Sequence, residues 1–153
     1  MKGFRRTITI PRPPEEVFAY ATAAEHIGEW LGEVVSIEAL QPGPVRVGAR
    51  YSQTRRVHGK EATTTVEIVK HRGPGQGPPP WEHAARAELM GVSGEYHYTF
   101  SPAGDGTKID LEARIEAKSL LARALVGVAA TEMEREDGDQ LERLARALAS
   151  AGT

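Results

Sequence analysis

The period of the hydrophobic pattern changes along this sequence, and that change constrains the fold more than any other feature. From Val34 to Ile115 apolar and polar residues alternate with a period of two, and turn residues interrupt the pattern at regular intervals. This pattern is typical of consecutive antiparallel strands. After Lys118 the apolar period becomes about 3.6, which predicts a helix from Ser119 to Ala149. An antiparallel sheet has one apolar face to cover, and this helix is long enough to cover it.

Seven strands and two short helices are expected before that helix. Glu15–Ala21 follows two prolines and begins with two acidic residues, which favour the start of a helix. A second short helix is expected at about Ala24–Leu31, weakened by Gly28. The strands are expected at 6–10, 34–40, 46–57, 60–70, 81–90, 94–101 and 107–116. The sequence therefore predicts a single α+β domain over residues 1–153 with an antiparallel sheet of about seven strands.

Two segments interrupt the regular patterns. Residues 72–80 contain three glycines and four prolines, which remove hydrogen-bond donors and predict a mobile or polyproline-like loop outside the sheet. Gly138 lies inside the predicted C-terminal helix, between Asp137 and Asp139. A glycine in a helix interior costs about 1 kcal/mol relative to alanine, so a bend is expected there.

The composition excludes several classes of protein. The absence of cysteine excludes disulfides, thiolate metal sites and cysteine nucleophiles. Nineteen basic and 21 acidic residues give a net charge of -2, which offers no basic surface for nucleic acid. No segment approaches the roughly 20 apolar residues of a membrane span, and the N-terminal segment lacks the apolar run of a signal peptide. We therefore expect a cytoplasmic protein without a nucleic-acid partner and without integral membrane association.

The sequence contains no recognisable metal motif. No two histidines have a paired ligand spacing such as His-Glu-x-x-His, and each histidine is expected at the surface or in a turn. The acidic run of residues 132–139 is expected to be a solvated helix face. The prediction is therefore that the protein uses no metal and no cofactor. The histidines are His26, His58, His71, His83 and His97.

Alternation along the strands assigns candidates to the inner face of the sheet. Tyr51, Gln53 and Arg55 share one face, and an inward Arg55 would need a carboxylate or a ligand anion as partner. In the segment 81–89 the odd positions, with two alanines, could leave space for a ligand. A buried tyrosine hydroxyl also needs a hydrogen-bond partner, although packing in the core is the alternative for the two tyrosines of the segment 96–100. The candidates for a cavity wall are Tyr51, Gln53, Arg55, His83, Tyr96, Tyr98 and the adaptable Met133.

Four short motifs carry a resemblance to a known family. They are Pro13–Tyr20, Glu25–Leu31, Val47–Tyr51 and Gly104–Thr107. In this order and spacing the chain resembles the polyketide cyclase/dehydrase branch of the SRPBCC superfamily, which includes START domains and the birch-pollen allergen. The resemblance implies a helix-grip fold, in which a curved sheet wraps around a long C-terminal helix and encloses a cavity. It also implies that Trp30 borders the cavity mouth.

Three functions are compatible with this pattern. The resemblance favours binding of a small hydrophobic, lipid-like or polyketide-like molecule in the cavity. The alternative is an aromatase/cyclase-type enzyme, in which Arg55 would stabilise an enolate, His83 would act as base and Tyr98 as proton donor. A third alternative is a protein-interaction module, which predicts an exposed apolar stripe at Leu141–Leu148. Ligand identity, catalysis, a homodimer and gating of the cavity by the loop 72–80 stay open.

Overall fold

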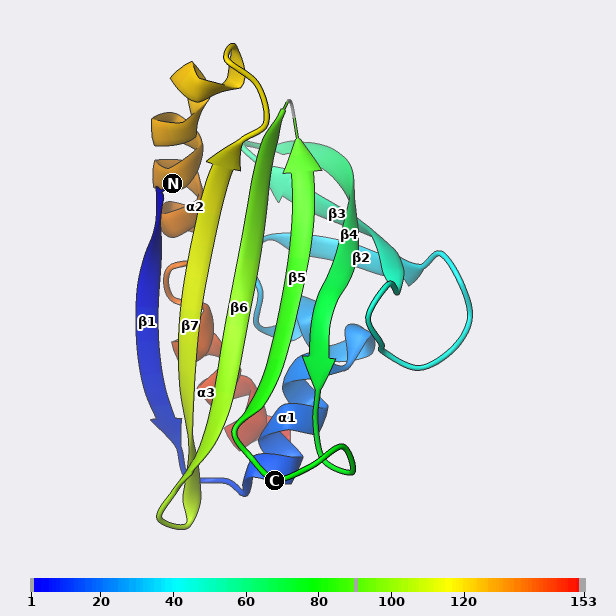
Figure 1. The fold of residues 1–153 in the computed structure, drawn as a ribbon, viewed down its shortest axis with the longest axis vertical. Coiled ribbons are helices and arrows are strands. Elements are labelled where there is room, and N and C mark those ends of the chain that lie inside the picture. The colour runs from blue at the N-terminus through cyan, green and yellow to red at the C-terminus, as the bar shows by residue number, and fades with distance from the viewer. Residues whose placement is uncertain (1, 90, 152–153) are drawn as a thin grey trace.

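The strands form one antiparallel sheet. The computed structural model describes residues 2–89 and 91–151, which form a seven-stranded sheet in the order β1-β7-β6-β5-β4-β3-β2 (Figure 1). The predicted fold class is confirmed, with two short helices after the first strand and the C-terminal helical segment packed on the sheet. The strands are β1 (Lys2–Ile10), β2 (Val34–Ala39), β3 (Arg50–Val57), β4 (Lys60–Arg72), β5 (Trp81–Leu89), β6 (Val92–Ala103) and β7 (Gly106–Ala117). The helices are α1 (Pro14–Thr22), the 3-10 helices η1 (Ala24–Glu29) and η2 (Ala122–Leu125), α2 (Val126–Asp137) and α3 (Gln140–Ala151).

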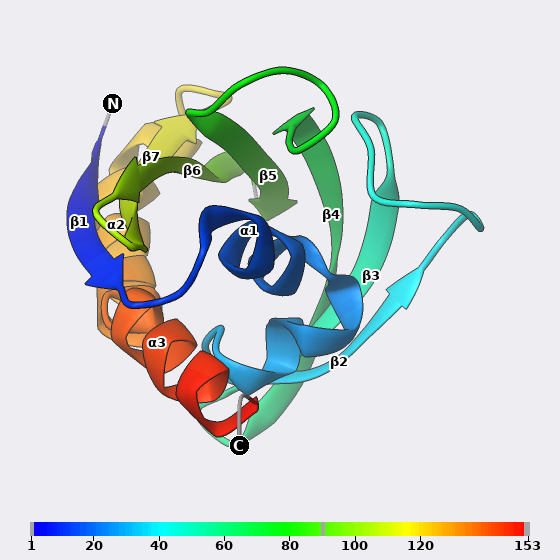
Figure 2. The ribbon, with the colours of Figure 1, turned by 90° about the horizontal axis from the view of Figure 1, so that it is seen from below.

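The connectivity places the helices on the concave side of the sheet. Strands β2 to β7 follow one another as a meander, and β1 pairs with β7 at the opposite edge from β2. The chain must therefore cross from one edge of the sheet to the other after β1, and it does so through α1 and η1. In Figure 2 the sheet curls around α1, and α2 and α3 run along the inside near β1. Contacts of α2 with β1 and β7, and of α3 with β1 and α1, agree with this arrangement.

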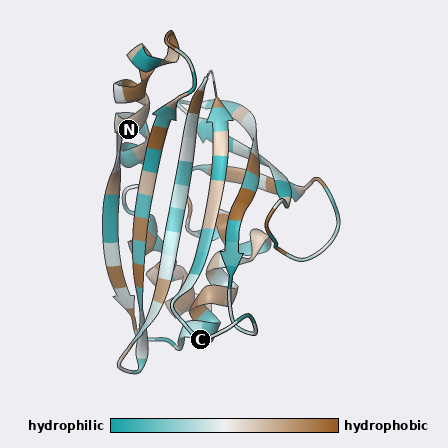
Figure 3. Cartoon of the chain, in the orientation of Figure 1, coloured by the Kyte–Doolittle hydropathy of each residue, from teal (hydrophilic) through white to brown (hydrophobic). Residues whose placement is uncertain are grey.

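The period-two pattern places one apolar face of β6 and β7 in the core. Tyr98 pairs with Leu111 and Phe100 pairs with Ile109 across the two strands, and all four side chains are buried. The alternation appears along the strands in Figure 3 as successive hydrophobic and hydrophilic bands. Helices α1 and α3 cover this part of the sheet. The buried helix side chains that pack there are Val17, Phe18, Ala21, Leu141, Leu144 and Leu148.

The helical segment predicted over residues 119–149 is divided into η2, α2 and α3. The bend predicted at Gly138 is confirmed, since α2 ends at Asp137 and α3 begins at Gln140. The amide of Gly138 donates to the carbonyl of Glu134 at 2.8 Å, and a Cβ at this position would lie 2.4 Å from that carbonyl oxygen. The close approach explains why glycine is suited to the break.

Several predicted boundaries also needed correction. β1 begins at Lys2 instead of residue 6, because the backbone of the basic N-terminal residues pairs with β7. β3 begins at Arg50 instead of 46, and the predicted strand end at position 90 lies outside the described residues. The second short helix is a 3-10 helix ending at Glu29. The shorter extent agrees with the weakening expected from its glycine.

Residues 73–80 of the predicted loop lie outside the sheet, but Arg72 is the last residue of β4 and pairs with Glu82. Hydrogen bonds tie the two ends of the loop together. Arg72 donates from Nη1 to the carbonyl of Pro80 at 2.8 Å, and the indole of Trp81 donates to the carbonyl of Gly77 at 3.1 Å. Elsewhere in the fold, no helix among the described residues is long and apolar enough to span a membrane.

Candidate ligand-binding cavity

A cavity of about 720 Å³ lies between the concave face of the sheet and the helices η1 and α2. Strands β3 to β6 supply one wall, and α2 supplies much of the facing wall. Small and apolar side chains dominate the lining. Exposed lining residues such as Leu89 and Val128 mark its mouth. The volume lies within the range of roughly 300–1,000 Å³ that is usual for small-molecule sites.

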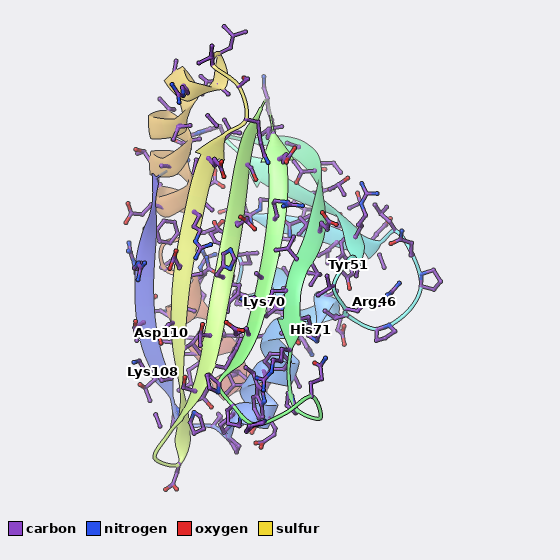
Figure 4. The ribbon with its side chains drawn as sticks, viewed as in Figure 1. Arg46, Tyr51, Lys70, His71, Lys108 and Asp110 are labelled. Carbon is purple, nitrogen blue, oxygen red and sulfur yellow. The ribbon has the colours of Figure 1, made fainter. Side chains whose placement is uncertain are left out.

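All the side chains proposed from the sequence for a cavity wall line this one cavity. Side chains two residues apart in a strand share a face. The predicted wall residues of β3 and of β6 therefore lie on the same side of the sheet. Figure 4 labels Tyr51 on β3, close to the loop that carries Arg46. The cavity-wall residues proposed from the sequence are Trp30, Tyr51, Gln53, Arg55, His83, Tyr96, Tyr98 and Met133.

Arg55 has the carboxylate partner that its inward position requires. Its Nη1 donates to both carboxylate oxygens of Asp137, at 2.9 and 3.1 Å, and its Nε donates to Oε1 of Gln53 at 2.9 Å. A second carboxylate, that of Glu136, lies 3.7 Å from Nη1. Desolvation alone would lower the pKa of Arg55, but the charge of Asp137 and its hydrogen bond raise the pKa above its ordinary value. Arg55 is therefore a permanent cation on this wall.

The expectation that residues 132–139 form a solvated acidic face is wrong for Asp137 and Glu136. Asp137 is only 2 % exposed, and the side chain of Glu136 is 15 % exposed. Asp137 lies four residues after Met133 and four before Leu141, so it falls on the helix stripe that faces the sheet. The sequence shows this spacing, but acidic side chains are so rarely buried that hydropathy alone does not assign Asp137 to the buried stripe.

Two tyrosines of β6 anchor the junction between α2 and α3. The hydroxyl of Tyr96 donates to Oδ2 of Asp137, and the hydroxyl of Tyr98 donates to Oε1 of Gln140. Gln140 in turn donates from Nε2 to the backbone carbonyl of Asp137 at 3.0 Å. Burial, and then the charge of Asp137, raises the pKa of both phenols well above the ordinary value. Both hydroxyls therefore stay protonated donors, and sequence reasoning had missed Gln140 altogether.

His83 is buried and uncharged, so its predicted place at the surface or in a turn is wrong. It is 6 % exposed, and its Nδ1 lies 3.0 Å from Nδ1 of His71 on the neighbouring strand. Burial, followed by the proximity of His71, lowers the pKa of His83 to about 3. For this hydrogen bond one ring nitrogen must donate and the other accept. The pair is thus two neutral imidazoles, of which His83 lines the cavity.

The three groups of the predicted acid/base enzyme do not form one hydrogen-bonded unit. The rings of His83 and Tyr98 have centroids 6.4 Å apart, but the hydroxyl of Tyr98 is engaged with Gln140 and Nδ1 of His83 with His71. Arg55 is held by Asp137. Among the described residues no hydrogen bond joins any two of Arg55, His83 and Tyr98. Within the same part of the chain, no group of three or more His, Asp or Glu side chains could hold a metal ion.

The exposed apolar stripe predicted for an interaction module is wrong. Leu141, Leu144 and Leu148 are 1 %, 0 % and 2 % exposed because α3 packs them into the core. Four exposed apolar side chains lie instead around η2 and the start of α2, namely Leu120, Leu121, Leu125 and Val128. Other exposed apolar side chains lie elsewhere, on Val35, Leu40, Val47 and Leu89.

The fold occurs in solved structures of low sequence identity. A protein from Thermus thermophilus, TTHA0849, is 21 % identical with a TM-score of 0.72, over 97 % of this chain and 98 % of that chain. Ara h 8.0201 is 16 % identical with a TM-score of 0.67, over 96 % and 97 % of the two chains. A Thalictrum norcoclaurine synthase is 12 % identical with a TM-score of 0.65, over 99 % and 96 %. No curated protein matches the chain.

A curved antiparallel sheet that wraps around C-terminal helices and leaves a cavity between them defines the helix-grip class. Within that class, the chain belongs to the polyketide cyclase/dehydrase and lipid transport family, whose model matches residues 1–149. The family resemblance drawn from the sequence is therefore confirmed. Membership supports hydrophobic ligand binding in general.

Proposed function

We propose that this protein binds a small lipid-like or polyketide-like molecule in the cavity between the sheet and α2. The observation that carries the proposal is the cavity itself, about 720 Å³ with a mainly apolar lining and one polar wall. Binding sites for small molecules typically combine these two features, because apolar surface supplies affinity and a few polar groups fix orientation. The family description, which includes lipid transport, agrees with this function.

The wall residues would have different tasks in this function. Tyr51 and Met133 would contact the apolar body of the ligand, with Met133 adapting its shape to different ligands. Arg55, Gln53 and Tyr96 would lie against its polar end, because they form the polar wall. This division predicts an amphipathic ligand with one polar end.

An aromatase/cyclase-type enzyme is the less supported function for the same cavity. A base whose pKa lies at about 3, as for His83, is poorly matched to proton abstraction near neutral pH. Turnover that is abolished by His83→Ala would favour the enzyme. A change limited to ligand selectivity would favour the binding protein.

The test is native mass spectrometry of gently purified protein, followed by denaturation and identification of any released molecule. We expect a stoichiometric apolar passenger. In the variant Ala85→Phe the added ring would occupy the cavity, since Ala85 lines it, and the passenger should be lost. Ala149→Phe adds the same ring on an exposed position of α3 and should leave the passenger in place. A wild-type protein that is empty and also takes up no added apolar ligand would refute the proposal.

A further inference from the structure

The charged groups inside the cavity carry more negative than positive charge. Arg55 supplies one cation, held by Asp137 through Nη1 at 2.9 and 3.1 Å. Glu136 adds a second carboxylate 3.7 Å from the same nitrogen. Glu136 also lines the cavity, and burial raises its pKa. Arg55 is thus already neutralised, and any ionised fraction of Glu136 makes this wall negative.

The other basic side chains of the lining do not change this balance. Arg86 pairs with Glu67 at 2.9 Å on the outer side of the sheet, and His58 lies 3.6 Å from Glu132 at the rim. His83 is uncharged, because burial lowers its pKa to about 3. Among the described lining residues, every Arg therefore has a carboxylate partner. The positive charge of each is already neutralised and does not attract an anionic ligand.

One donor on the cavity wall nevertheless lacks a partner. The hydrogen bonds of Arg55 use Nε and Nη1, and none joins Nη2 to a described residue. A ligand group that accepts a hydrogen bond from Nη2 would satisfy this donor without adding charge.

We propose that the cavity selects molecules whose polar end is an uncharged acceptor, such as a ketone or hydroxyl, and rejects carboxylates of the same shape. The proposal rests on the proposed binding function. A ketone oxygen can accept a hydrogen bond from Nη2 of Arg55 at little electrostatic cost. A carboxylate would lose its hydration while facing Asp137 and Glu136, which disfavours it in a site of low dielectric constant.

The experiment compares two probes of nearly equal shape, 2-acetylnaphthalene and 2-naphthoate, by calorimetric titration at pH 7.5. We expect the wild-type protein to bind the ketone at least 10-fold more tightly than the carboxylate. Glu136→Gln removes one negative charge and keeps the size of the side chain. It should therefore reduce the ratio of the ketone affinity to the carboxylate affinity at least 3-fold. Glu136 has ion pairs only at 3.7 and 3.8 Å, so this variant breaks no hydrogen bond of the fold.

The matched control is Glu134→Gln, which removes the same charge from the same helix. Glu134 pairs with Arg6 away from the cavity, so this variant should leave the preference unchanged. Equal affinity of the two probes for wild-type protein would overturn the inference, and so would a preference that Glu136→Gln leaves intact. Binding of neither probe would instead count against the proposed binding function, since the cavity is large enough for both.

Discussion

Replacement of Asp137 by alanine tests whether the buried ion pair stabilises the fold. The variant leaves the guanidinium of Arg55 without its carboxylate and the hydroxyl of Tyr96 without its acceptor. Breaking a buried pair costs about 3–5 kcal/mol. We take the lower end, about 3 kcal/mol, because the side chain of Arg55 keeps 19 % exposure. For a domain of this size that corresponds to a fall in Tm of roughly 6–12 °C.

The assay is urea denaturation followed by circular dichroism, with thermal unfolding as a second measurement. Glu134→Ala is the matched control, because its ion pair with Arg6 is at the surface and should contribute no more than about 1 kcal/mol. The double variant Arg55→Met/Asp137→Ala should recover part of the loss, since it leaves no unpaired charge. If Asp137→Ala costs no more than the control, the assignment of Asp137 as the essential counter-ion is refuted.

Three further predictions concern the helix break, the buried histidine and the buried tyrosine. Gly138→Ala should lower the free energy of unfolding by about 1–3 kcal/mol, because its Cβ would lie 2.4 Å from the carbonyl of Glu134; an unchanged Tm would contradict this. His83 should keep neutral-imidazole NMR shifts down to pH 5, since its pKa in the folded protein is about 3. The unfolded chain binds the proton first, so stability should fall as pH drops from about 6.5 towards 3, and His83→Gln should flatten that slope. Tyr98→Phe should cost about 1–3 kcal/mol in urea denaturation, because it leaves Oε1 of Gln140 buried without its donor; a loss below about 0.5 kcal/mol would argue against that bond.

The sheet could be predicted from the sequence because strands β2 to β7 have the same order in the sheet as along the chain. Each strand repeats a two-residue pattern and ends at a turn signal, so local information was sufficient. β1 was harder to delimit. Its first residues, around Arg5 and Arg6, show no apolar alternation and join the sheet through backbone pairing with β7. Backbone hydrogen bonds do not depend on the hydropathy of the side chains, so the hydropathy pattern does not reveal this part of the strand.

The candidate site could be predicted from the strands but not from the helices. Alternation brought Gln53 and Arg55 to the inner face, and the need for a carboxylate near Arg55 followed from the cost of burying a charge. The identity of that carboxylate did not follow, because Asp137 is 82 residues away in sequence. Only the packing of α2 against the sheet decides which acidic residue of its run meets the arginine.

The junction at Gly138 separates two helices with different attachments. α3 is fixed by leucines in the core, whereas α2 has Asp137 at its end and Met133 and Val128 along the cavity. Tyr96 and Tyr98 hold the two sides of the junction from a single strand. A single strand therefore ties the helix that lines the cavity to the helix that closes the core, so the position of the cavity wall depends on the packing of the core.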